Sequence, residues 1–294
     1  MLPETWTILK LLKWTTDYFK SHHIEQPRAA AEILLAHTLG VGRVDLYVQY
    51  DRHIGLKELE IFKGFIRRRI QREPVAYIVG KKEFWSMDLK VTPDVLIPRP
   101  ETETLVETVL AIVPLELKPA PLRILDLGTG SGAIVLAIAS ERPGNSFYAV
   151  DRSEQALDVA RNNARTHKLD KAVTFLQGDW FDPVRDRRRY FDVIVSNPPY
   201  ISSRVFEVLP LEIAGHEPRE ALEGGLDRLD AIRIIIKDAP DHMVPGGWLL
   251  FEIGYEQWAA VEKLFAGSGA YSDWAVIKDY SGCNRVVRAR TTGK

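Results

Sequence analysis

The chain has 294 residues, 46% of them hydrophobic, and a formal net charge of −1 from 39 Lys plus Arg against 40 Asp plus Glu. This length and apolar content suffice for a sizeable core and about two domains, while the near-neutral charge argues against a tight, nonspecific nucleic-acid binder. The one cysteine cannot form an internal disulfide, no Cys/His cluster has zinc spacing, and no apolar run approaches the roughly 20 residues that cross a bilayer, so we expect a cytoplasmic protein without metal or membrane contact.

The first part of the chain, residues 1–76, is predicted to be a small helical bundle. Its start, Met1–Glu4, lacks the basic and apolar segments of an export signal, so export is not expected. Apolar residues recur at three- and four-residue steps in three segments; the second starts near Pro27 and stops at Gly40, and Pro74 ends the third. We interpret the run Arg67–Arg69 as a solvated helix face. The inward-facing residues of the three segments are Ile8, Leu11, Leu12, Phe19, Ile33, Leu34, Leu59, Phe62, Ile66 and Ile70.

Between residues 77 and 100 the helical period disappears. Phe84, Trp85, Leu89 and Val91 are separated by polar residues, which is typical of a hairpin or an extended segment. We therefore predict a β-hairpin linker over residues 77–100, followed by a larger domain over residues 101–294.

From Leu122 onward, strand-like segments alternate with helical ones near 131–142, 153–168, 226–239 and 255–266. This alternation predicts an α/β fold with a mostly parallel sheet covered on both faces. The last two strand-like segments have no helix between them, so they are expected to pair antiparallel. The seven predicted strands are Ile124–Leu127, Phe147–Val150, Val173–Leu176, Val193–Val195, Trp248–Phe251, Ala275–Ile277 and Arg285–Arg288.

A glycine-rich loop, Gly128–Gly132, follows the first of these strands directly. Glycines let the backbone turn sharply and let a ligand approach the peptide plane. The second strand ends in Asp151, about twenty residues later, where a carboxylate can accept hydrogen bonds from ribose hydroxyls. The third ends near Asp179 and Trp180, which suit an adenine ring. These three strand ends predict an adenosine-type ligand; the alternatives are that Asp151 only caps the next helix and that Trp180 is core.

A polar arm, Asn197-Pro198-Pro199-Tyr200, follows the fourth predicted strand. The prolines cannot donate backbone hydrogen bonds and hold the arm in extended geometry. Its carbonyl oxygens and the Asn197 amide could accept hydrogen bonds from a planar NH2 group of a ligand. If this strand lies beside the one that precedes Gly128, the arm faces the ligand site; a simple proline-rich turn is the alternative.

These motifs resemble the class I S-adenosylmethionine-dependent methyltransferases, and specifically the protein-(glutamine-N5) methyltransferases that modify class 1 peptide chain release factors. The general signature lies in Asp126–Gly132, Asp151 and Asn197–Tyr200. The narrower resemblance adds the segments Ile97–Glu103, Gly178–Phe181, His216–Leu222 and Asp279–Arg285.

The resemblance implies a Rossmann-like methyltransferase sheet and S-adenosylmethionine as cofactor. It implies that the substrate is a release factor whose Gly-Gly-Gln glutamine is methylated. We expect residues 1–76 to recognise this substrate, with no direct nucleic-acid contact, and the enzyme to be a monomer. The implied cofactor-binding residues are Gly128, Thr129, Gly130, Ser131, Gly132, Asp151, Trp180 and Asn197. The implied substrate-binding residues are Asn197, Pro198, Pro199 and Tyr200, among which we expect Asn197, Pro198 and Tyr200 to be catalytic.

Two other functions remain open at the level of sequence. An adenine or guanine amino group presents the same two hydrogens as a glutamine amide, but an enzyme acting on nucleic acid must also grip phosphates, which the near-neutral charge does not favour. A protein that only binds S-adenosylmethionine would not need the polar arm. His216 and Glu217 could supply a general base, although a substrate contact or a helix start explains them more simply.

Overall fold

The computed structural model describes residues 6–115 and 120–292. They form two compact units, one made of Met1–Gly80 with Pro210–His216 and the other of Lys81–Leu209 with Glu217–Lys294. The segment Met1–Glu4, on which the expectation about export rests, and the outermost ends of the predicted domains lie outside the described residues. No helix in the described ranges is long and apolar enough to cross a membrane.

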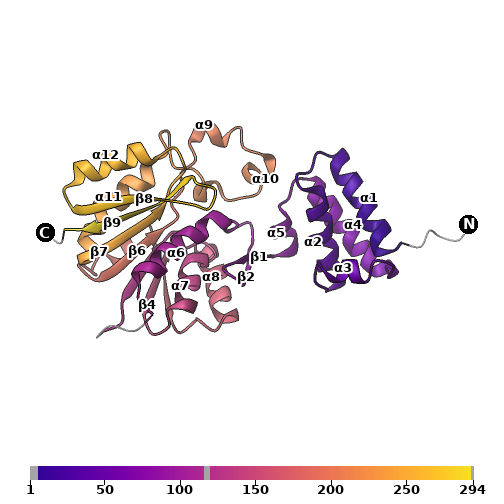
Figure 1. The fold of residues 1–294 in the computed structure, drawn as a ribbon, viewed down its shortest axis with the longest axis horizontal. Coiled ribbons are helices and arrows are strands. Elements are labelled where there is room, and N and C mark those ends of the chain that lie inside the picture. Colours follow the sequence, from indigo (N-terminus) through magenta and orange to yellow (C-terminus); the bar gives the residue numbers. More distant parts are fainter. Residues whose placement is uncertain (1–5, 116–119, 293–294) are drawn as a thin grey trace, which may run out of the picture. The chain divides into compact units, whose positions relative to one another are not determined.

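The first unit is helical (Figure 1). The predicted apolar faces are confirmed for Ile8, Leu11, Leu12 and Phe19, all of which are buried in its core. The second helix begins at Pro27, as predicted, because a proline at the first helical position has a preset φ and no N–H to leave unpaired. The helices are α1 (Ile8–Ser21), α2 (Pro27–Leu39), α3 (Asp45–Val48), α4 (Leu56–Ile70), α5 (Val75–Val79) and α10 (Leu211–Ala214).

The interpretation of Arg67–Arg69 as a solvated face is wrong for Arg69. Its side chain is only 4% exposed, and its Nη2 lies 2.6 Å from Glu212 Oε1 within the same unit. Arg68 instead binds Glu73. A buried guanidinium needs a carboxylate partner, and that partner is supplied by a segment more than a hundred residues away in sequence.

The second unit is built on a seven-stranded sheet with the order β5-β4-β3-β6-β7-β9-β8. The first five of these strands pair in parallel, whereas β9 pairs antiparallel with both β7 and β8. The predicted mostly parallel sheet and its antiparallel end are therefore confirmed. The strands are β3 (Arg123–Leu127), β4 (Ser146–Asp151), β5 (Val173–Gln177), β6 (Phe191–Ser196), β7 (Met243–Glu252), β8 (Tyr271–Lys278) and β9 (Asn284–Thr291).

Helices cover both faces of this sheet (Figure 1). Successive strand residues point to opposite faces, so that Ile124 packs in the core with α6 and α7, whereas Leu125 packs in the core with α11 and α12. The helices are α6 (Glu103–Ile112), α7 (Ala133–Glu141), α8 (Glu154–Thr166), α9 (Ser203–Phe206), α11 (Asp230–His242) and α12 (Trp258–Ser268), with 3-10 turns at η1 (Pro100–Thr102), η2 (Asp182–Val184) and η3 (Arg219–Ala221).

The predicted hairpin is present as β1 (Lys81–Phe84) and β2 (Met87–Lys90), which pair antiparallel. Phe84 and Leu89 are buried in the same core as α6 and α7, so the hairpin is part of the second unit's core. Asn163 of α8 connects the hairpin to the rest of the second unit by hydrogen bonds. Its amide accepts from Lys90 N (2.7 Å) and donates to Lys90 O (3.0 Å) and to Ser131 O (2.9 Å).

Asn163→Ala should lower the free energy of unfolding by at least about 2 kcal/mol, because each buried backbone group left without a partner costs about 1–3 kcal/mol. The neighbouring Asn162 is exposed, so Asn162→Ala is a matched control that should change stability by less than about 0.5 kcal/mol. Urea unfolding of both variants measures the difference. Equal midpoints would show that Asn163 does not hold the hairpin.

Candidate active site

The site lies where the order of the sheet reverses, between β3 and β6. Leu127 at the end of β3 pairs in parallel with Ser196 at the end of β6, which confirms that the strand before Asn197 lies beside the strand before Gly128. In open α/β sheets ligands bind at the carboxyl ends of the strands beside such a reversal. A cavity of about 710 Å³ is found there, lined by residues that follow β3, β4, β5 and β6.

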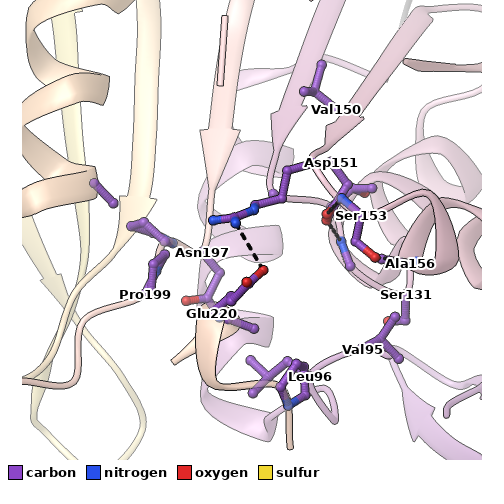
Figure 2. Close-up of a pocket in the computed structure, with 18 of the residues that line it drawn as sticks. Val95, Leu96, Ser131, Val150, Asp151, Ser153, Ala156, Asn197, Pro199 and Glu220 are labelled. Atoms are coloured by element: carbon purple, nitrogen blue, oxygen red, sulfur yellow. Dashed lines mark hydrogen bonds and ion pairs between the residues drawn. The ribbon is translucent and has the colours of Figure 1, made fainter. Parts of the chain in front are cut away.

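Figure 2 shows how side chains from separate elements surround this cavity. Asn197 and Pro199 lie on one side, and Asp151, Ser153 and Ala156 on the other. The candidate residues that line it are Gly128, Thr129, Gly130, Ser131, Asp151, Trp180, Asn197, Pro198 and Pro199. Two candidates, Gly132 and Tyr200, are not among the lining residues.

The glycine loop is shaped so that its backbone faces open space. Gly128 and Gly130 have φ values of +71° and +55°, and a Cβ added at either would meet no atom within 4 Å. The empty space is therefore available to a ligand that approaches the peptide planes. Gly132 serves the helix instead, since it is the N-cap of α7 and a Cβ there would lie 3.0 Å from Leu136 Cδ1.

Asp151 holds the glycine loop against the start of the next helix. Its Oδ2 accepts from Gly130 N (2.8 Å), and its Oδ1 accepts from Ser153 N (3.0 Å). Burial raises its pKa, which these backbone hydrogen bonds partly oppose. The carboxylate thus both supports the turn before α8 and lines the cavity, so the two readings of Asp151 from sequence are compatible.

The polar arm is held in extended geometry by the segment opposite it. Ile201 N donates to Leu222 O (2.9 Å) and Gly224 N donates to Ile201 O (2.8 Å). A Cβ at Gly224 would lie 2.5 Å from Pro199 O, so only glycine allows this close approach. Tyr200 turns away from the cavity lining, and its hydroxyl donates to the buried Glu252 Oε1 (2.8 Å).

Four hydrogen bonds around the site were missed by sequence reasoning because they join distant segments. Asn197 Nδ2 donates to Thr102 Oγ1 (3.2 Å), which donates to Glu252 Oε2 (2.7 Å). Glu217 is buried, accepting from Arg99 Nη2 (2.5 Å) and from Ile97 N (3.2 Å). These bonds occupy the Glu217 carboxylate, which does not favour it as a general base.

Two of the residues that line the cavity also form an ion pair. Arg152 Nη2 lies 3.2 Å from Glu220 Oε2, drawn as the dashed line at Glu220 in Figure 2. Both side chains are more than half exposed, so the pair contributes at most about 1 kcal/mol. In the described parts of the chain, no group of three or more His, Cys, Asp or Glu side chains is arranged to hold a metal ion.

Asp126 lies behind the glycine loop and is fully buried. Its Oδ2 accepts from Thr129 Oγ1 (2.7 Å), whereas Oδ1 has no hydrogen-bond partner among the described residues. Burial raises the pKa of this carboxyl to about 7; the Thr129 hydrogen bond opposes the shift and the charge of Asp151 adds to it. The loop that shapes the cavity is therefore anchored on a carboxyl group that titrates near neutrality.

Comparison with known proteins identifies the family. Residues 10–80 match the family described as PrmC N-terminal domain, and residues 120–237 match a family described as methyltransferase domain. A release factor glutamine methyltransferase from Geobacter sulfurreducens is 42% identical over 288 residues, which cover 98% of each chain. One of the same name from Coxiella burnetii is 45% identical and covers 90% of this chain and 92% of that protein. The chain belongs to the release factor glutamine methyltransferase family.

Solved structures agree with this family at the level of the fold. The catalytic domain of hMettl16, crystallised with the MAT2A 3′UTR hairpin 6, has a TM-score of 0.57 at 15% identity and covers 71% of this chain and 77% of that one. A methyltransferase from Pyrococcus furiosus has a TM-score of 0.51 at 19% identity, with 71% and 90% covered. The Rossmann-like methyltransferase sheet and the resemblance to glutamine methyltransferases are thus confirmed, and the chain is a methyltransferase.

In this glutamine methyltransferase, Asp126→Asn should stabilise the fold at high pH. Because the pKa of Asp126 is about 7 in the folded protein and about 4 in an unfolded chain, the folded state binds more protons between these values. The free energy of unfolding contributed by this group therefore falls as pH rises from about 4 to about 7.

Asn cannot ionise and its Oδ1 can still accept from Thr129, so the variant lacks this loss. At pH 8 the free energy of unfolding of the variant should exceed that of the wild type by up to roughly 4 kcal/mol. This difference should shrink toward pH 4. Urea unfolding across this range measures it. Asp151 adds a slope of the same sign to both proteins, which cancels in the comparison apart from its charge interaction with Asp126. A constant difference at all pH values would contradict the assignment.

Proposed function

We propose that this chain binds S-adenosylmethionine in the cavity beside the glycine loop and transfers its methyl group to the side-chain amide nitrogen of the glutamine in the Gly-Gly-Gln motif of class 1 release factors. The observation that carries the proposal is that Asn197 and Pro198, which bear the candidate oxygen acceptors, line the same cavity as Gly128 and Gly130. The near full-length similarity to release factor glutamine methyltransferases supports the choice of substrate.

The residues present fit the cofactor. A volume of about 710 Å³ is within the roughly 300–1,000 Å³ of sites for ligands of this size. Each Asp151 oxygen accepts one backbone N–H and retains a lone pair, so Asp151 would bind the ribose hydroxyls. Trp180 would contact the adenine, and the open space at Gly128 and Gly130 would admit the rest. When bound, this cofactor supplies a methyl group on a positively charged sulfur.

The acceptor amide would be oriented by the polar arm. Asn197 Nδ2 already donates to Thr102, so Asn197 Oδ1 is the atom left to accept a hydrogen bond. Together with the Pro198 carbonyl it would receive the two N–H bonds of the glutamine NH2 group. Both acceptors also favour the partial positive charge that develops on nitrogen during methyl transfer.

Positioning is the main demand of this reaction, because an amide nitrogen is a poor nucleophile whose lone pair is delocalised into the carbonyl. Orienting two reactants can supply roughly 7–11 kcal/mol of the barrier. A strong base is not required, since the methylated amide cation is acidic enough to lose its proton to solvent. Tyr200 does not act as a base here: burial, the charge of Glu252 and the hydrogen bond to it raise the Tyr200 pKa, so the phenol stays protonated.

Asn197→Ala should reduce kcat by at least about a hundredfold, as is typical when one preorganised hydrogen-bonding group is lost. The affinity for S-adenosylmethionine, measured by calorimetry, should change far less because the glycine loop and Asp151 remain. Transfer from radiolabelled cofactor to purified release factor gives the rate, and peptide mass mapping gives the modified residue. Wild-type turnover in the variant would remove Asn197 from the mechanism, and labelling of nucleic acid in place of release factor would overturn the substrate.

We further propose that the helical unit binds the release factor at a surface distant from the reacting glutamine. Several apolar side chains of this unit are exposed, among them Val48 at 72% and Leu56 at 83%. Exposed apolar groups of this kind are suited to binding another protein. A substrate held at two places would be oriented before its glutamine enters the cavity.

The double variant Val48→Ser/Leu56→Ser should raise KM for intact release factor severalfold and leave methylation of a short Gly-Gly-Gln peptide unchanged, since the peptide lacks the rest of the release factor's surface. Leu115→Ser, at a residue that is 71% exposed on the second unit, is the matched control. Steady-state kinetics with both substrates separate the effects. An unchanged KM for the intact protein would argue against these residues as the contact.

A further inference from the structure

A buried carboxylate, that of Glu252, joins both ends of the polar arm to the segment before α6. Glu252 is the last residue of β7 and is 1% exposed. Its Oε2 accepts from Thr102 Oγ1 (2.7 Å), and its Oε1 accepts from the Tyr200 hydroxyl (2.8 Å). Thr102 in turn accepts from Asn197 Nδ2 (3.2 Å). Neither Glu252 nor Tyr200 is among the residues that line the cavity, whereas Thr102 and Asn197 are.

With Glu252 ionised, the direction of these hydrogen bonds follows from elementary chemistry. A hydroxyl group has a single proton to donate, and Thr102 gives it to the Glu252 carboxylate, which can only accept. Toward Asn197, Thr102 can therefore act only as an acceptor. This forces the NH2 end of the Asn197 amide toward Thr102 and leaves Oδ1 as the free end.

The orientation matters because the two ends of an asparagine amide have nearly the same shape and opposite hydrogen-bonding character. A flipped Asn197 would present N–H bonds to the N–H bonds of the acceptor amide. The flipped side chain would repel the substrate it is proposed to hold. A hydrogen bond that prevents this flip therefore contributes to turnover without contacting the substrate.

We propose that Glu252, acting through Thr102, is a positioning residue that sets the orientation of the Asn197 amide, and that its second oxygen fixes Tyr200 at the other end of the arm. This inference rests on the proposed function, since it assumes that Asn197 Oδ1 receives the acceptor amide. It adds two residues, from η1 and β7, that determine which hydrogen-bonding face the site presents.

Thr102→Val removes the hydroxyl and keeps the side-chain shape. It should lower kcat by about 10- to 100-fold, the loss typical when a group that orients a binding residue is removed, with little change in the affinity for S-adenosylmethionine. Thr102→Ser keeps the hydroxyl and should retain most of the wild-type kcat. Glu252→Leu removes both acceptor oxygens that Thr102 and Tyr200 use and should resemble Thr102→Val.

The matched control is Thr104→Val, two residues along the chain. Thr104 is also buried, its Oγ1 has no hydrogen-bond partner among the described residues, and it does not line the cavity. The same substitution there should leave kcat unchanged. A loss of kcat in Thr104→Val equal to that in Thr102→Val would mean that any threonine change in this segment disturbs the site, and would overturn the relay.

A double-mutant cycle separates positioning from a structural role. If Thr102 acts through Asn197, Thr102→Val should lower kcat in the wild type but by less than about twofold in the Asn197→Ala background, where no amide is left to orient. Equal losses in both backgrounds would overturn the inference, as would wild-type kcat in Thr102→Val while Asn197→Ala is impaired. Full activity of Asn197→Ala would instead show that the proposed role of Asn197 is wrong. The inference that Glu252 and Thr102 orient Asn197 would then be wrong as well.

Discussion

The parallel pairing of β3 with β6 is the constraint on which the site depends. It brings Leu127 and Ser196 side by side, so that the glycine loop and the polar arm leave the sheet at the same edge. Either motif alone could serve many ligands. Their adjacency places residues of both motifs in the lining of one cavity, as the proposed methyl transfer from a nucleoside cofactor to an amide requires.

Carboxyl groups that are buried, or half-buried in the case of Asp151, fix the loops at this edge. Asp126 holds Thr129, Asp151 holds Gly130, Glu217 holds Arg99, and Glu252 holds Thr102. Burying a charge is unfavourable unless hydrogen bonds compensate it. For Glu252, burial raises the pKa, while the hydrogen bonds from Thr102 and Tyr200 and the charge of Arg285 oppose the rise. Burial of these carboxyl groups thus lowers the stability of the second unit, most clearly at Asp126. In return, they hold irregular backbone in a defined shape.

The sequence was sufficient to predict features that depend on local pattern. The alternation of strands and helices predicted the sheet, and the glycine loop, Asp151 and the Asn197 arm were predicted to meet because all follow parallel strands. Contacts between distant segments were not predictable in this way. Thr102 and Glu252 are separated by 150 residues, and no spacing rule joins them. Arg69 was misread as solvated for the same reason, since its partner Glu212 belongs to a far segment.

Tyr200 shows how a correctly recognised motif can still leave a residue's role open. The motif places Tyr200 next to three lining residues, but its hydroxyl donates to Glu252 and its ring is not part of the lining. Its hydroxyl therefore helps to hold the arm, while its expected part in catalysis stays a prediction. Two prolines restrict the backbone of the arm, and one carboxylate restrains the side chains at both of its ends.

The fold alone does not select the acceptor. Structures with the same sheet at 15–19% identity include a catalytic domain bound to an RNA hairpin, and an exocyclic amino group of a base offers the same two N–H bonds as a glutamine. An arm that recognises only an NH2 group cannot distinguish a nucleic-acid base from a glutamine side chain. We propose that discrimination comes from what is added to the sheet, namely the helical unit and the segments around Arg99 and Glu220. The whole chain has a net charge of −1, and the helical unit exposes apolar side chains such as Val48 and Leu56, which suits a folded protein better than a phosphate backbone.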